Sequence, residues 1–267
     1  MKKYIFLILL PLSVMLILLT CATNPLTGKT TMAFVDNSEL FATSFQQYDQ
    51  FLSENKVVTG TAEAQMVERL GKNIRTAAEK WLAADGHSDY LDGYEWEYHL
   101  VDSQEVNAWC MPGGKIVVYT GILPVTQTED GLATVMGHEV AHALLNHGQQ
   151  RMSAGVLQQL GGAAIGGLAS GGSENTQTLT MLAYGIGSEV FGTLPFSREH
   201  ESEADHYGLI LMAIAGYAPE ESIPFWERMA VLSGGTVEFL STHPSDATRI
   251  RQLRGWIGEA KRKAAEL

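Results

Sequence analysis

Residues 132–145 read LATVMGHEVAHALL and place two histidines inside an apolar run. His138 and His142 are four positions apart, so on an α-helix their imidazoles lie on one face, one turn apart. Glu139 lies about 100° round the same helix from His138. Because an unpaired charge is costly among apolar side chains, this pattern favours a buried site over a solvated helix face.

Two imidazoles and a carboxylate are a ligand set that suits zinc. A zinc ion with an open coordination position makes water acidic enough to attack a carbonyl group at neutral pH. Glu139, held close to that water, would take its proton and later give it to the leaving amine. The HExxH pattern therefore predicts hydrolysis of peptide bonds with one zinc ion per chain.

Two histidines alone do not make a stable metal site, so a third ligand is expected, and the segment ESEAD at 201–205 is the best candidate. On a helix Glu201 and Asp205 share one face, whereas Glu203 points about 200° away from Glu201. Only one of the two glutamates can therefore face the histidines. Glu201 is favoured because Asp205, four residues on, can accept the outer N–H of a ligand histidine.

The rest of the chain predicts a mainly helical fold. Helices are expected at 38–52, 62–82, 128–152, 197–216 and 245–263, from apolar periodicity and from capping and turn signals. Strands are expected at 94–101 and 115–120, the second after a Pro-Gly-Gly turn. No break in composition divides residues 36–267. The sequence thus predicts one α+β domain, mainly α-helical, with one small β-sheet.

Residues 1–20 differ from the rest in that two lysines precede an apolar run. This pattern is typical of an export signal, and its length leaves an uncleaved membrane anchor as the alternative. The string LLTC at 18–21 resembles a bacterial lipobox, although Thr20 departs from the small residue that is usual there. We therefore expect lipidation of Cys21 and, because Ala22 is not aspartate, sorting to an outer membrane.

The following residues, 21–35, contain Asn, Pro and Gly without an apolar period and are expected to form a tether. Together these signals predict a periplasm-facing outer-membrane lipoprotein in a bacterial cell envelope. The full chain has 18 basic and 30 acidic residues and a net charge of −12. Nucleic acid is therefore excluded as a partner, because binding to phosphate groups needs clustered Lys and Arg.

Five blocks in sequence order resemble the HExxH gluzincin metallopeptidases that include HtpX-like, CaaX prenyl and Oma-type proteases, with the nearest likeness to the BepA/LoiP/Oma-like branch. The blocks are CATNPLTGK, NAWCMPGGKIVVYTGIL, GHEVAHALLNHGQQRMS, SREHESEADHYG and STHPSDATRI. This resemblance implies a zincin-like fold with zinc on His138, His142 and Glu201 and with Glu139 as the general base. It also implies that residues 111–114 and the next strand border the active-site cleft. His243 matches a histidine that either caps the metal or stabilises the oxyanion.

The leading hypothesis is a membrane-tethered zinc metalloendopeptidase that acts on misfolded or loosely folded envelope proteins, a role in quality control that the resemblance supplies. Its partners would be such proteins and a membrane, reached through the N-terminal lipid or anchor. The alternative is a chaperone or assembly factor for outer-membrane proteins with little proteolytic turnover. Glu139 favours the enzyme, because a binding module has no need of a general base. The remaining histidines in these blocks, His147, His200 and His206, are expected to lie away from the metal.

Overall fold

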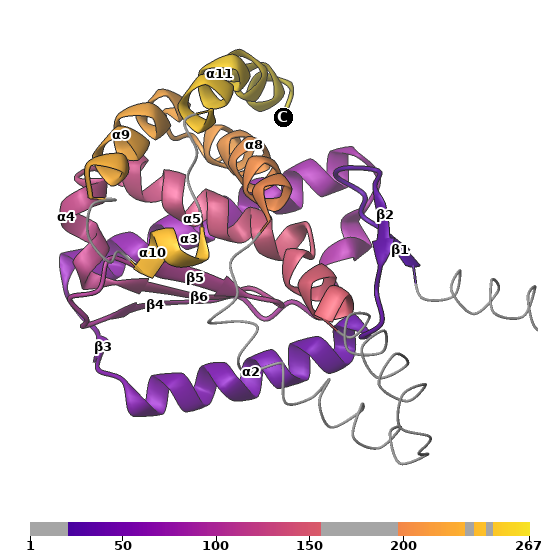
Figure 1. Ribbon diagram of the computed structural model, residues 1–267, viewed down its shortest axis with the longest axis horizontal. Helices are drawn as coiled ribbons and strands as arrows, with labels where there is room; N and C mark the ends of the chain where they lie inside the picture. Colours follow the sequence, from indigo (N-terminus) through magenta and orange to yellow (C-terminus); the bar gives the residue numbers. More distant parts are fainter. Residues whose placement is uncertain (1–20, 156–196, 233–237, 244–247) are drawn as a thin grey trace, which may run out of the picture.

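A four-stranded sheet lies between helices in the computed structural model, which describes residues 21–155, 197–232, 238–243 and 248–267 (Figure 1). The strands follow the order β3 (Val57–Val58), β4 (Glu97–Val101), β6 (Lys115–Tyr119) and β5 (Ala108–Met111). β4 and β6 are parallel, and the other two pairs are antiparallel. β6 is central and its three β-branched residues are fully buried, whereas β5 is an edge strand.

The turn between β5 and β6 depends on two glycines. Gly113 and Gly114 have φ angles of +85° and +89°, in the left-handed region that favours glycine. A Cβ atom on Gly114 would lie 2.7 Å from the Trp96 ring, so no side chain fits there. The turn therefore fixes the position of β5, which, like β3, was not predicted from the sequence.

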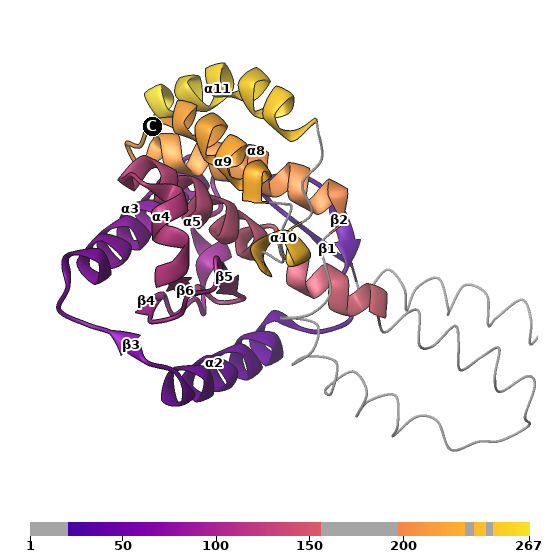
Figure 2. The same cartoon turned by 60° about the vertical axis from the view of Figure 1, so that its left-hand side comes forward.

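Helices cover both faces of the sheet (Figures 1 and 2). α2 (Asn37–Glu54), capped by the Asp36 carboxylate, lies on one face and buries Tyr48 completely. α3 (Ala62–Ala84) and α5 (Glu129–Leu144) lie on the other face. α5 begins at the Thr128 cap, and all its residues from Gly131 to Leu144 are buried. The predicted α+β, mainly helical fold is confirmed.

The motif-bearing helix is shorter than expected. It was predicted to run to about residue 152, but α5 ends at Leu144 and the chain turns at Asn146, whose φ is +56°. Residues 147–155 are helical again. Asparagine tolerates this backbone better than other residues with a side chain, which explains why the turn occurs there although the helical pattern continues across it.

A third layer of helices lies over α5: α8 (Arg198–Ile214), α9 (Ser222–Leu232) and α11 (Arg249–Glu266) (Figure 1). α5 and α8 cross where Gly137 faces Gly208, and a Cβ on either glycine would lie 2.8 Å from the backbone of the other helix. The short elements are α4 (Leu123–Thr126), α10 (Glu238–Thr242) and the 3-10 turns Ser88–Leu91, Thr120–Ile122 and Pro219–Glu221.

The N-terminal part of the described chain differs from the expected tether. β1 (Cys21–Thr23) and β2 (Thr30–Met32) form an antiparallel hairpin, and Asn24 between them is buried. The Asn24 amide donates to the Leu144 carbonyl at 2.8 Å, at the end of α5. The predicted signal or anchor, residues 1–20, lies outside the described residues. Among the helices that are described, none combines the length and the apolar character needed to cross a bilayer.

Candidate metal centre

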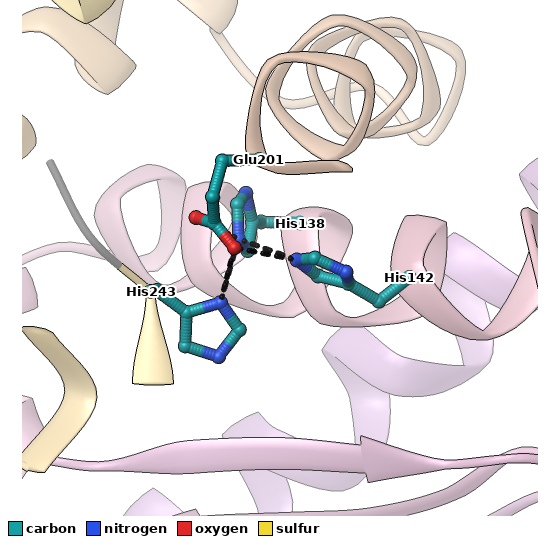
Figure 3. A group of neighbouring side chains, drawn as sticks. All are labelled: His138, His142, Glu201 and His243. Atoms are coloured by element: carbon teal, nitrogen blue, oxygen red, sulfur yellow. Dashed lines mark hydrogen bonds and ion pairs between the residues drawn. The ribbon is translucent and has the colours of Figure 1, made fainter. Parts of the chain in front are cut away.

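The two histidines of the motif point from α5 toward one point (Figure 3). The Nε2 atoms of His138 and His142 lie 3.0 Å apart, and both side chains are at least 97% buried. Because the two histidines are four residues apart, the second imidazole lies one turn beyond the first on the same face of the helix, and the two rings converge.

Glu201 reaches the same point from α8, one helix layer above (Figure 3). Its Oε2 lies 3.5 Å from Nε2 of His138, and its Oε1 lies 3.4 Å from Nε2 of His142. Glu203 instead faces the N-terminal hairpin, where its carboxylate pairs with Lys29 at 2.5 Å. The structure thus brings Glu201, and not Glu203, to the histidine pair.

His243 completes the group from the segment that follows α10. Its Nδ1 lies 3.1 Å from Oε1 of Glu201 and 3.3 Å from Nε2 of His138. Its ring stacks on Phe239, with centroids 4.6 Å apart. One ligand atom from each of the four residues lies within 4.8 Å of all the others.

These side chains fit a tetrahedral metal ion. Zinc–ligand bonds of ~2.0–2.2 Å in a tetrahedron place neighbouring ligand atoms roughly 3.3–3.6 Å apart. The five distances given above run from 3.0 to 3.5 Å, close to this spacing, with His138 facing Oε2 of Glu201 and the other two histidines facing Oε1. In addition, the buried carboxylates of Glu201 and Asp205 share one buried cation, Arg249, and the buried carboxylate of Glu139 lies beside His243. A divalent cation would balance the remaining negative charge, which is costly when buried alone.

A second layer of polar groups holds the ligands in place. Asp205 Oδ1 accepts from Nδ1 of His138 at 2.9 Å, which leaves Nε2 of that ring for a metal. Arg249 donates to Asp205 at 2.5 Å and to Glu201 at 2.6 Å, and its guanidinium lies 3.8 Å from the centre of the Trp226 ring. No motif or spacing in the sequence indicates a role for Arg249. Its only signal was its place in the block STHPSDATRI.

The other histidines lie outside the ligand group. His147 contacts the outer nitrogen of His142, with the two Nδ1 atoms 2.9 Å apart. His200 stacks on His147 at 4.3 Å, and His206 pairs with Glu259 at 3.0 Å.

Cys21, the predicted lipidation site, is half-buried at the start of β1.

Burial and neighbouring charges set the protonation of the group. Burial lowers the pKa of His142 and so favours the neutral imidazole that a metal requires. Burial also acts on the pKa of His138, but Asp205 and Glu201 outweigh it and raise the pKa to about 10. Metal binding must therefore displace a proton from His138. Burial raises the pKa of Glu139, partly offset by His243 and His138, which suits a residue that accepts a proton near neutral pH.

A cleft of about 450 Å³ leads to the ligand group. Glu139, His142 and His243 line it on one side, and the edge strand β5 borders it. Trp109 lines this cleft and packs edge-on against Phe51 of α2. The arrangement gives an extended chain room between α2 and the outer edge of β5, with which no strand of the described residues pairs.

Comparison with known proteins supports this assignment. Residues 69–257 match Peptidase family M48. The mitochondrial metalloendopeptidase OMA1 of Saccharomyces cerevisiae is 36% identical over 203 residues, which are 73% of this chain and 56% of that protein. OMA1 of Schizosaccharomyces pombe is 36% identical over 195 residues, with 71% and 54% covered. The metalloprotease LoiP of Escherichia coli is 26% identical over 217 residues, with 80% and 84% covered. The chain thus spans about half the length of the OMA1 proteins of these two yeasts. The family resemblance predicted from the sequence is confirmed.

The predicted localisation is wrong. Relatives that are 36% identical are mitochondrial proteins, whereas the bacterial LoiP is more distant, so a bacterial outer-membrane lipoprotein is not supported. The prediction combined an export-signal pattern in residues 1–20 with the lipobox-like string LLTC, from which Thr20 already departed, and with Ala22. Such short patterns carry little weight beside similarity over 203 residues.

Proposed function

The chain belongs to peptidase family M48, and on that premise we propose that it is a zinc-dependent metalloendopeptidase that cleaves extended segments of misfolded or loosely folded proteins. One observation carries this proposal: four buried potential ligand atoms within 4.8 Å of one another lie beside the buried carboxylate of Glu139 at one cleft.

His138, His142 and Glu201 would hold the zinc ion. When bound, the ion would supply Lewis acidity, polarising a carbonyl group and making water a nucleophile at neutral pH. Glu139 accepts the proton of the attacking water and gives it to the leaving amine, since its carboxylate is buried at the cleft beside the ligand group. Asp205 and Arg249 keep the ligand side chains in place during this cycle.

The outer edge of β5, unpaired with any other strand in the part of the chain that the structure describes, supports the choice of an extended substrate. A strand that lacks a partner on one side offers backbone donors and acceptors to a chain that lies alongside it. Phe51, Trp109 and Tyr119 give the cleft an aromatic wall on which apolar substrate side chains would pack. Such side chains are exposed in misfolded proteins and buried in folded ones. Residues 1–20, with two lysines before an apolar run, would hold the enzyme at a membrane.

His243 occupies the fourth position of the ligand group, where an active metallopeptidase needs space for water. We therefore include latency in the proposal: in the resting enzyme His243 caps the metal, and it moves aside when substrate binds. Its Nε2 also lies 3.5 Å from Oε1 of Glu139, so the same imidazole lies next to the general base.

The test is cleavage of an unfolded, casein-like substrate by the purified protein. We expect 1,10-phenanthroline to abolish cleavage and added zinc to restore it. Glu139→Gln should keep the metal but lose at least ~10²-fold in rate, the usual scale for a positioned general base. Cleavage by metal-free protein, or near wild-type turnover of Glu139→Gln, would refute the proposal. A chaperone or assembly factor, the alternative function, would keep its activity in that variant.

A further inference from the structure

A line of polar groups runs from the metal site to the N-terminal hairpin. Nδ1 of His142 lies 2.9 Å from Nδ1 of His147, and Nε2 of His147 lies 3.1 Å from Oε2 of Glu203. Oε1 of Glu203 lies 2.5 Å from Nζ of Lys29, in the hairpin. The line begins at the side of the His142 ring that faces away from the other ligand atoms.

The chemistry of His142 and of Glu203 determines which ring nitrogen of His142 and His147 carries a proton. A neutral His142 that offers Nε2 to a metal carries its proton on Nδ1 and must donate from there. Nδ1 of His147 then accepts, so His147 carries its proton on Nε2 and donates it to the Glu203 carboxylate. Lys29 balances the charge of that carboxylate. Each of the three contacts therefore joins a donor to an acceptor.

The backbone is built to place His147 there. In a continuous helix His147 would lie about 140° round the axis from His142 and would point elsewhere. The turn at Asn146, with φ of +56°, redirects the chain, and His147 becomes fully buried. The hairpin stabilises this turn through Asn24, which donates to the Leu144 carbonyl at 2.8 Å, and Tyr90 of the 3-10 turn Ser88–Leu91 donates to the same carbonyl at 2.8 Å. His200 stacks on the His147 ring and limits its rotation.

His138, the other histidine of the motif, is supported in a similar way. His138 donates from Nδ1 to Asp205, and Asp205 is paired with the cation Arg249. On the outer side of the His142 ring, Nδ1 faces the imidazole of His147. That imidazole extends the reach of Glu203, which is paired with the cation Lys29. Each ring is thus connected to a carboxylate that pairs with a cation, His138 directly and His142 through His147.

We propose that His147 is a positioning residue for the metal site, which fixes the tautomer and ring orientation of His142, and that Glu203 and Lys29 tie this support to the N-terminal hairpin. The inference rests on the proposed function, since it assumes that His142 is a metal ligand. It makes the hairpin part of the metal site, although the hairpin contributes no ligand.

The experiment measures zinc affinity by competition with a chromophoric chelator, together with the visible absorption spectrum of the cobalt-substituted protein. We expect His147→Ala to bind zinc ~10–100-fold more weakly, the scale for loss of a partner of a metal ligand. Its cobalt spectrum should change, because His142 is then free to rotate. His147→Asn should recover part of the affinity, since its side-chain oxygen replaces the acceptor next to His142. Glu203→Gln should have a smaller effect than His147→Ala, because its amide oxygen still accepts from His147.

The matched control is His206→Ala, which also breaks a His–Glu pair but lies away from the ligands. It should bind zinc as the wild type does. Wild-type affinity and an unchanged cobalt spectrum in His147→Ala would overturn the proposal. If that variant does not fold, wild-type affinity in both His147→Asn and Glu203→Gln would do so. Failure of the wild-type protein to bind zinc would instead refute the proposed function, and the two failures are therefore distinguishable.

Discussion

Glu201 and Glu203 are two residues apart on α8, yet they belong to different parts of the molecule. Glu201 is 3% exposed and contacts His138, His142 and His243, and these three partners hold the pKa of its carboxyl far below the usual range despite burial. Glu203 faces His147 and Lys29. Because each residue turns the helix by about 100°, the two side chains point about 200° apart, Glu201 toward the ligand group and Glu203 toward His147.

Metal analysis of three variants tests this difference at the residue scale. Glu201→Gln should lose most of the zinc and the activity, because it removes an anionic ligand. Glu203→Gln should keep full zinc stoichiometry at saturating zinc. Asp205→Asn should fall between them, with affinity or activity lower by ~10–100-fold. Zinc retained in Glu201→Gln and lost in Glu203→Gln would reverse the assignment of the third ligand.

His243 offers a second prediction at this scale. If it caps the metal, His243→Ala should raise the rate of casein cleavage by opening the fourth position to water. If it stabilises the oxyanion, the same change should lower kcat by about 10²-fold with the metal content intact. The 3.1 and 3.3 Å distances from its Nδ1 to the other ligand atoms favour the cap. Steady-state kinetics and metal analysis of the one variant separate the two outcomes.

Residues on a single helix could be related from the sequence, and residues joined only in space could not. The pairs His138–His142 and Glu201–Asp205 follow from helical spacing alone. No helical spacing indicated a role for Arg249 or His147. Arg249 contacts α8 from α11, and His147 joins His142 to Glu203 of α8. His147 was expected to face away from the metal, and the turn at Asn146 instead brings it behind His142.

At the scale of elements, the crossing of α5 and α8 places Glu201 and Asp205 over the histidines. Gly137 and Gly208 allow the two backbones to touch, and Gly208 is only three residues from Asp205. A side chain at this crossing would push the helices apart. Because the ligands come from both helices, the distances between them depend on this contact.

Gly208→Ala should therefore destabilise the fold and loosen the metal site together. A new Cβ would lie 2.8 Å from backbone atoms of Gly137 and His138, so we expect a loss of about 1–3 kcal/mol in the free energy of unfolding. Zinc affinity should fall as well. The control is Gly255→Ala in α11, where no atom lies within 4 Å of the new Cβ. That change should be neutral or stabilising by up to about 1 kcal/mol. Urea denaturation of both variants measures the difference, and equal effects would show that the crossing does not require glycine.

The predictability of elements follows the strength of their periodicity. The segment 62–82 has a long amphipathic period and became α3, with bounds Ala62–Ala84. β5 has only four residues, and its place in the sheet is set by the glycine turn and by pairing with β6, which no local pattern reveals. The small sheet could be predicted, but its edge strand beside the cleft could not.

At the scale of the whole molecule, contacts between distant segments decide what the site includes. The hairpin of residues 21–32 was expected to be a tether because it has turn residues and no apolar period. Its stability comes instead from hydrogen bonds and ion pairs with α5 and α8, made by Asn24 and Lys29. Such contacts leave no periodic signal. Localisation could not be established from the short N-terminal patterns either.

Acid stability tests the link between the hairpin and the body of the protein. The hydrogen bond from His147, with a further one from Lys29, lowers the pKa of Glu203 from 4.5 to about 2, against the effect of burial. Since the pKa is lower in the folded than in the unfolded chain, ionised Glu203 stabilises the fold above about pH 4.5. This stabilisation is lost as the pH falls toward 2.

We therefore expect Glu203→Gln to be less stable than the wild type at neutral pH, by at most about 3 kcal/mol, and the difference to shrink as the pH falls below about 4.5. Urea denaturation of both proteins from neutral pH to about pH 3 measures it, with a chelator present so that metal loss does not contribute. Glu199→Gln is the matched control, because Glu199 pairs with the same lysine but its side chain is 72% exposed. An exposed ion pair contributes about 0–1 kcal/mol, so this control should differ little from the wild type at any pH. A deficit in Glu203→Gln that stays constant on acidification would mean that shape, and not the charge of Glu203, holds the hairpin, α8 and His147 together.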